Sequence, residues 1–90
     1  MTDEEILRSA IALWGEKSQF DLAVGEIGEL LTLFGRRAQG RDTKDQWVSE
    51  IADVLIMMSQ LALIVGPEEV EAEMARKLAR LEQRVKNNRM

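Results

Sequence analysis

Four segments of the chain repeat apolar residues at the three- and four-residue spacing of an amphipathic helix. We expect helices over residues 2–15, 19–37, 43–65 and 67–86, joined by short polar or glycine-containing segments. No stretch gives the strand signal of alternating apolar and polar residues. The pattern therefore predicts one all-α domain covering residues 1–90, with its four helices packed as a bundle.

Capping signals mark the ends of the expected helices. Thr2 followed by Glu5, and Thr43 followed by Gln46, both fit a capping box, in which two side chains bind free N–H groups of the first turn. Gly66-Pro67 suits the end of the third helix and the start of the fourth, because glycine is common just after a helix and proline at its first position.

The third expected helix is apolar almost all the way round. After Asp53 the next charged residue is Glu68, so little of this helix is suited to water. Either the second and fourth helices wrap it fully, or a second copy of the chain covers the remaining face. We favour the second copy.

Two glycines, Gly25 and Gly28, lie inside the second expected helix, where each costs about 1 kcal/mol relative to alanine. We expect the backbone of another helix to pass close to them. The alternative is weak selection at these two positions.

The composition excludes several kinds of chemistry. The chain has no histidine and no cysteine, which excludes disulfides, zinc–thiolate sites and Ser-His or Cys-His catalysis. Its net charge of −4 argues against a nucleic-acid partner. The acidic amino terminus lacks the order of a signal peptide, and the longest uncharged run is short for a membrane span. We therefore expect a cytoplasmic protein with no membrane partner.

Two pairs of carboxylates point to a metal site. Glu26 and Glu29 lie three residues apart in the second helix, and Glu50 and Asp53 three residues apart in the third, so each pair shares a helix face. A short loop makes consecutive helices antiparallel neighbours, and we expect the two pairs to face each other. Acidic groups among apolar neighbours need cations to stay ionised. Oxygen ligands select hard ions, Mg²⁺ first and Mn²⁺ as a substitute.

A simpler interpretation of the same residues is solvated surface charge. For Glu50 and Asp53, interaction with the positive end of the helix dipole is a further alternative.

The segments Glu26-Ile-Gly-Glu29 and Glu50-Ile-Ala-Asp53 resemble the MazG-like branch of the all-α nucleoside triphosphate pyrophosphohydrolases. Segments 14–19, 56–60 and 77–80 extend the resemblance over most of the chain. It implies Mg²⁺-dependent hydrolysis of a nucleoside triphosphate between the α and β phosphates, giving a nucleoside monophosphate and pyrophosphate. It also implies a four-helix bundle completed by oligomerisation, as a homodimer or a dimer of dimers, with the site between helices of different subunits.

The resemblance also implies roles for individual residues. The metal ligands that activate a water would be Glu26, Glu29, Glu50 and Asp53. In an alternative, one of these carboxylates, such as Glu29, positions the attacking water instead.

Further matches lie outside the carboxylate pairs. Lys77 and Arg80 match basic residues that meet the triphosphate, and the alternative for Lys77 is an ion pair with Glu73. Trp14 and Gln19 match the region on the side of the base, and the alternative for Trp14 is core packing.

The chain departs from the resemblance at Gly25, where members often carry a second glutamate. The lost acid would thin the metal shell or weaken catalysis. Two rival functions stay open. One is a phosphoribosyl-ATP pyrophosphohydrolase-like enzyme with the same chemistry. The other, for which Gly25 is the only sign, is a helical interaction module whose site has decayed.

Overall fold

The computed structural model describes residues 1–89, and all regular structure in this range is α-helical. The four helices are α1 (Asp3–Trp14), α2 (Glu16–Ala38), α3 (Lys44–Val65) and α4 (Pro67–Lys86). The predicted all-α class is therefore confirmed. The first joint is shorter than expected, because Gly15 alone turns the chain at a φ of 88° and α2 begins at Glu16, three residues before its expected start.

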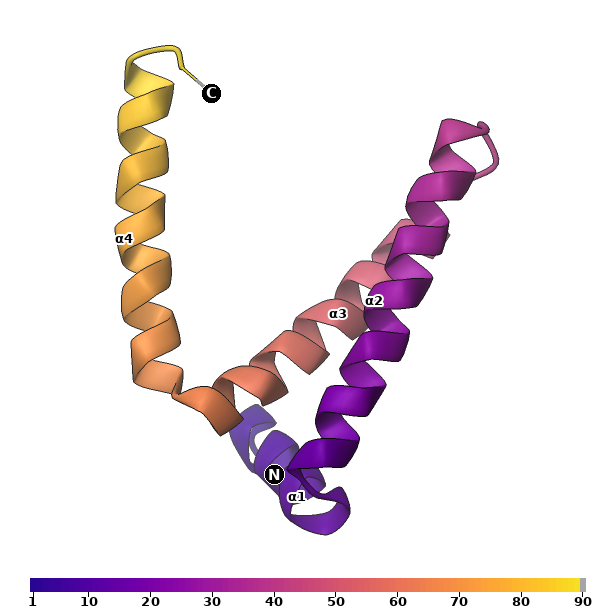
Figure 1. Ribbon diagram of the computed structural model, residues 1–90, viewed down its shortest axis with the longest axis vertical. Coiled ribbons are helices and arrows are strands. Elements are labelled where there is room, and N and C mark those ends of the chain that lie inside the picture. The colour runs from indigo at the N-terminus through magenta and orange to yellow at the C-terminus, as the bar shows by residue number, and fades with distance from the viewer. Residues whose placement is uncertain (90) are drawn as a thin grey trace.

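An antiparallel hairpin of α2 and α3 is the centre of the molecule (Figure 1). Helix α1 contacts both members of this hairpin near the end where α2 begins. Helix α4 contacts only α3 and stands away from the hairpin (Figure 1). One chain by itself therefore forms an open arrangement of four helices. Residues 71–86 of α4 are all exposed in it.

The dimensions of the chain measure how open this arrangement is. Its radius of gyration is 16.1 Å, whereas a compact domain of this length has a radius of about 12 Å. Its accessible surface is 7172 Å², against about 5,300 Å² for a compact monomer of this mass. The chain therefore exposes roughly 1,900 Å² more than a compact monomer does.

The core inside one chain is thin. The buried apolar side chains are Ala23, Leu33 and Met57, and they come from α2 and α3. Apolar side chains of all four helices remain exposed; Leu55 on α3, for example, keeps 61% of its surface in contact with solvent. Little of the free energy that apolar burial can provide is therefore gained within one chain.

The caps explain where α1 and α3 begin. The capping box at α3 is present as predicted: Thr43 Oγ1 accepts from Gln46 N at 3.2 Å, and Gln46 Oε1 accepts from Thr43 N at 2.9 Å. At α1 only half of the predicted box forms. Thr2 Oγ1 accepts from Glu5 N, but the Glu5 carboxylate accepts from the Thr2 hydroxyl and not from the backbone.

The two glycines inside α2 have no neighbour that requires them. A Cβ atom added at Gly25 or Gly28 would meet nothing within 4 Å in the described part of the chain. The prediction that another backbone passes close to them is therefore wrong within a single chain.

Helix α3 is the one helix of residues 1–89 that is long and apolar enough to cross a membrane, judged by length and composition alone. The central helix of a soluble protein meets the same criterion but is mostly buried, whereas only 11% of the apolar part of α3 is buried within one chain. Glu50 and Asp53 lie within α3, and carboxylates are rare inside a bilayer.

Candidate metal centre

The α2–α3 hairpin brings the two carboxylate pairs to one place. One carboxylate oxygen from each of four residues lies within 4.8 Å of the corresponding oxygens of the other three. These residues are Glu26 and Glu29 of α2 and Glu50 and Asp53 of α3. The convergence predicted from the sequence is therefore present in the folded chain, and we call these four residues the carboxylate cluster.

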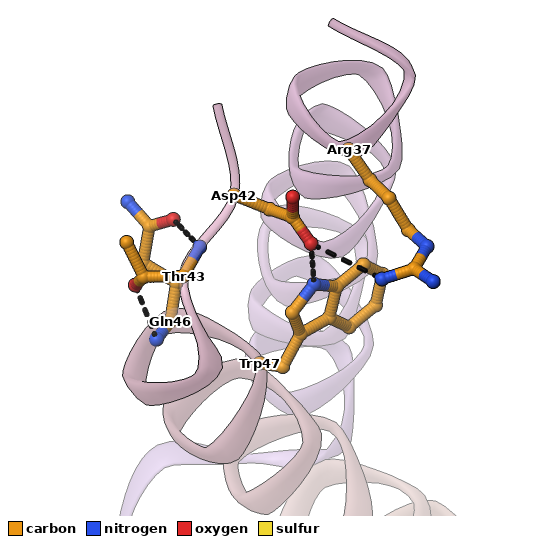
Figure 2. Close-up of polar contacts among 5 residues, drawn as sticks. All are labelled: Arg37, Asp42, Thr43, Gln46 and Trp47. Carbon is orange, nitrogen blue, oxygen red and sulfur yellow. Dashed lines mark hydrogen bonds and ion pairs between the residues drawn. The ribbon is translucent and has the colours of Figure 1, made fainter. Parts of the chain in front are cut away.

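The loop between α2 and α3 fixes how the two helices are paired. Trp47 Nε1 donates to Asp42 Oδ2 at 2.7 Å, and Arg37 Nη1 donates to the same oxygen at 3.3 Å, as Figure 2 shows. The Trp47 ring packs edge-to-face against Phe34, with the ring centroids 5.0 Å apart and the planes at 87°. These contacts join the end of α2 to the start of α3, and therefore help to set the register in which the carboxylates face each other.

Neither Asp42 nor Trp47 is among the candidate site residues that the sequence predicts. The indole N–H is the largest cause of the lowered pKa of the Asp42 carboxyl, and the Arg37 guanidinium also contributes. The only signal in the sequence is an aspartate directly before the helix cap at Thr43, with a tryptophan one turn into the helix that follows.

The environment of the carboxylate cluster disfavours its own negative charge. Burial raises the pKa of the Glu26 carboxyl above its ordinary value, and the charges of Glu29, Asp53 and Glu50 add to the rise. Burial is likewise the main cause of the raised pKa of Glu50; Glu29 and Asp53 add to it, whereas the Arg36 guanidinium opposes it. The four carboxylates therefore destabilise one another when all of them are ionised.

Two oxygens of the carboxylate cluster lack any partner. Glu26 Oε2 and Glu50 Oε2 are both buried from solvent and accept no hydrogen bond from any described residue. Buried carboxylate oxygens are normally paired with a donor or a cation. Together with the oxygen-only donor set, these two atoms are compatible with a hard divalent cation.

A cavity of about 370 Å³ opens beside the carboxylate cluster. Besides Glu29 and Glu50, it is lined by Thr32, Leu33, Arg36 and Gln46. Its size lies within the usual range for small-molecule sites, roughly 300–1,000 Å³. Arg36 was not singled out from the sequence, although its position seven residues after Glu29 places both on one face of α2.

The remaining predicted site residues do not line this cavity. Lys77 and Arg80 lie on α4, each beside a different surface pocket. Trp14 ends α1 and is 61% exposed, whereas Gln19 on α2 is 1% exposed and its Nε2 has no hydrogen-bond partner. One chain thus assembles the four carboxylates but leaves the predicted phosphate and base contacts elsewhere, and the roles of these four residues stay predictions.

No family model, curated protein or solved structure matches the chain.

Proposed function

We propose that this chain hydrolyses a nucleoside triphosphate, or a related nucleotide, between its α and β phosphates with the help of Mg²⁺, releasing a nucleoside monophosphate and pyrophosphate. The observation that carries the proposal is the carboxylate cluster, whose four oxygens lie within 4.8 Å of one another. Two of its buried oxygens have no other partner. Hydrolysis of this kind requires charge stabilisation and an activated water rather than a histidine or cysteine.

The four carboxylates divide by their exposure. Glu26, Glu50 and Asp53 are half-buried, and Glu29 is exposed. The half-buried three would hold Mg²⁺, which when bound neutralises phosphate charge and lowers the pKa of a coordinated water. Glu29, which also lines the cavity, would either complete the ligand set or orient the attacking water. Mn²⁺ would substitute for Mg²⁺, since it prefers the same oxygen ligands.

We further propose that the chain works as a homodimer or a dimer of dimers, which closes the four-helix bundle that one chain leaves open. The support is the excess surface of roughly 1,900 Å² per chain. Two copies burying that area would form an interface of roughly 3,800 Å², which is within the range of obligate dimers. A second copy would also bring its own α4, with Lys77 and Arg80, and its own Trp14 and Gln19, within reach of a site that lacks them.

The same interface accounts for the apolar length of α3. We propose that a second copy, and not lipid, covers this helix, and that the protein is cytoplasmic. The presence of Glu50 and Asp53 within α3 supports this proposal, because carboxylates in a lipid-facing helix are costly. The net charge of −4 gives no support for a nucleic-acid partner.

Thermal melts with and without Mg²⁺ test the metal site. Mg²⁺ at one hundred times its dissociation constant stabilises the folded protein by about 2.7 kcal/mol, which raises the melting temperature of a small domain by roughly 10–20 °C. The Asp53→Asn variant should respond much less. Asp45→Asn is the matched control, since Asp45 lies in the first turn of α3 outside the carboxylate cluster. An equal response of wild type and Asp53→Asn would contradict the proposal.

Release of pyrophosphate from a panel of nucleoside triphosphates and phosphoribosyl-ATP then tests the reaction and names the substrate. Turnover of phosphoribosyl-ATP alone would favour the rival enzyme. Mg²⁺ binding without turnover of any nucleotide would favour an interaction module that has lost its activity. The Gly25→Glu variant asks whether the missing acid limits the rate; the open space around Gly25 leaves room for that side chain.

A further inference from the structure

The cavity beside the carboxylate cluster has the chemistry of a phosphate pocket rather than of a base pocket. Only one of its lining side chains, Leu33, is apolar, and none is aromatic, so the cavity offers no flat face on which a base can stack. Four of the others are two carboxylates, a hydroxyl and an amide, which are Glu29, Glu50, Thr32 and Gln46. A ligand that fits here is polar and carries its own charge.

Among residues 1–89, Arg36 is the only one with a cationic side chain that lines this cavity. No carboxylate of residues 1–89 forms an ion pair with it. Its neighbour Arg37 differs, because Arg37 is held by Asp42 in the α2–α3 loop. The guanidinium of Arg36 therefore keeps its hydrogen-bond donors available on the cavity side of α2.

The other polar groups of the cavity are partly committed. The Thr32 hydroxyl donates to the backbone oxygen of Gly28 at 3.0 Å. The side-chain oxygen of Gln46 accepts from Thr43 N within the capping box. Arg36 is thus the group best able to bind an anion, and a guanidinium can bind two oxygens of a phosphate at once.

We infer that Arg36 contacts the part of the nucleotide's phosphate chain that leaves as pyrophosphate, while the carboxylate cluster holds a metal bound to the same phosphate chain. This inference rests on the proposed function. Arg36 lies seven residues after Glu29, about 10 Å further along α2, and both side chains line one cavity. A phosphate chain bound along the cavity would contact Arg36 at one end and the metal held by the carboxylate cluster at the other.

A different role for Arg36 is to offset the charge of Glu50 without touching the substrate. The two roles differ in what they do to metal binding. A residue that acts on Glu50 would change Mg²⁺ affinity and pyrophosphate affinity together. A residue that contacts phosphate would change pyrophosphate affinity alone.

Calorimetric titrations of the full chain separate these roles, first with Mg²⁺ alone and then with inorganic pyrophosphate at saturating Mg²⁺. For Arg36→Gln we expect Mg²⁺ affinity within about twofold of wild type and pyrophosphate affinity about ten- to a hundredfold weaker, as for loss of a hydrogen bond between charged groups. Arg36→Lys keeps the charge but not the two-pronged geometry, and should fall between the two. Arg41→Gln is the matched control, since Arg41 is exposed at the same end of the hairpin and does not line the cavity, and pyrophosphate affinity should stay unchanged.

Unchanged pyrophosphate binding by Arg36→Gln would overturn the assignment of Arg36 while leaving the proposed function standing. Parallel loss of Mg²⁺ and pyrophosphate binding would also overturn it, in favour of the role on Glu50. If the wild type binds Mg²⁺ but not pyrophosphate, the assignment fails and the metal site remains. If the wild type binds neither, the proposed function itself fails.

Discussion

Replacing Leu55 with aspartate on α3 tests whether a second copy covers this helix. Leu55 lines an apolar groove with Ile56 of α3 and with Ile6 and Leu7 of α1, and 61% of its surface is exposed in one chain. Full burial of a leucine side chain is worth about 1.5–3 kcal/mol. If the partner buries the exposed part, each Leu55 contributes roughly 1–2 kcal/mol to association.

A two-fold symmetric dimer loses this contribution twice. The loss is then roughly 2–4 kcal/mol, or a dissociation constant roughly 30- to 700-fold higher, before the cost of burying two carboxylates is added. Because Leu55 is mostly exposed in one chain, the fold of the monomer should tolerate the change. Sedimentation velocity over a range of concentrations measures the dissociation constant directly.

Ser49→Asp is the control for Leu55→Asp. It adds the same charge to α3 at an exposed polar position, and it should leave association unchanged. A wild type that sediments as a monomer at micromolar concentrations would refute the reasoning, and so would a Leu55→Asp variant that associates as tightly as the wild type.

Three further outcomes are expected. Without metal, the unfolding free energy should fall as pH rises from the ordinary glutamate pKa through the raised pKa values of Glu26 and Glu50. In this range the folded state binds more protons than the unfolded state. Urea titrations with EDTA should show this fall, and Mg²⁺ should remove it. Leu33→Ala should cost about 2–5 kcal/mol of stability, measured by urea unfolding, because Leu33 is 3% exposed. Trp47→Phe keeps a ring against Phe34 but removes the indole donor, and should lower the melting temperature by a few degrees.

Matched variants exist for the last two changes. Leu31→Ala, at a position 64% exposed, should cost far less than Leu33→Ala. Trp14→Phe, at a position 61% exposed, should change the melting temperature less than Trp47→Phe. Equal effects within either pair would show that burial in one chain does not determine stability. A metal-free protein whose stability rises with pH over the stated window would contradict the electrostatics of the carboxylate cluster.

Local signals in the sequence were sufficient for the helices and for the convergence of the carboxylates. The cap at Thr43 and the break at Gly66-Pro67 depend on residues within one turn of each other, so their geometry follows from local chemistry. The carboxylate cluster follows from a three-residue spacing and one short loop. Neither required knowledge of distant contacts.

Features that depend on distant contacts could not be predicted. The position of α4 depends on a single joint at Gly66, which leaves no periodic signal. Whether Gly25 and Gly28 face another helix depends on how helices cross, and they face open space in one chain. The place of Arg36 in the cavity could not be predicted either. An arginine on an exposed helix face is common, and only the neighbouring helix makes this one part of a pocket.

Because the joints at Gly15 and Gly66 are one residue long, the number of residues in each helix is constrained, even where the residue types are not. Each residue added inside α3 would rotate everything after it by about 100° and advance it by about 1.5 Å. The apolar side chains of α4 (Met74, Leu78, Leu81 and Val85) would then point in a new direction, and a one-residue joint is too short to compensate. Between α1 and α4, insertions and deletions should therefore be tolerated only at residues 39–41 of the α2–α3 loop, before the contacts of Asp42 and the cap at Thr43.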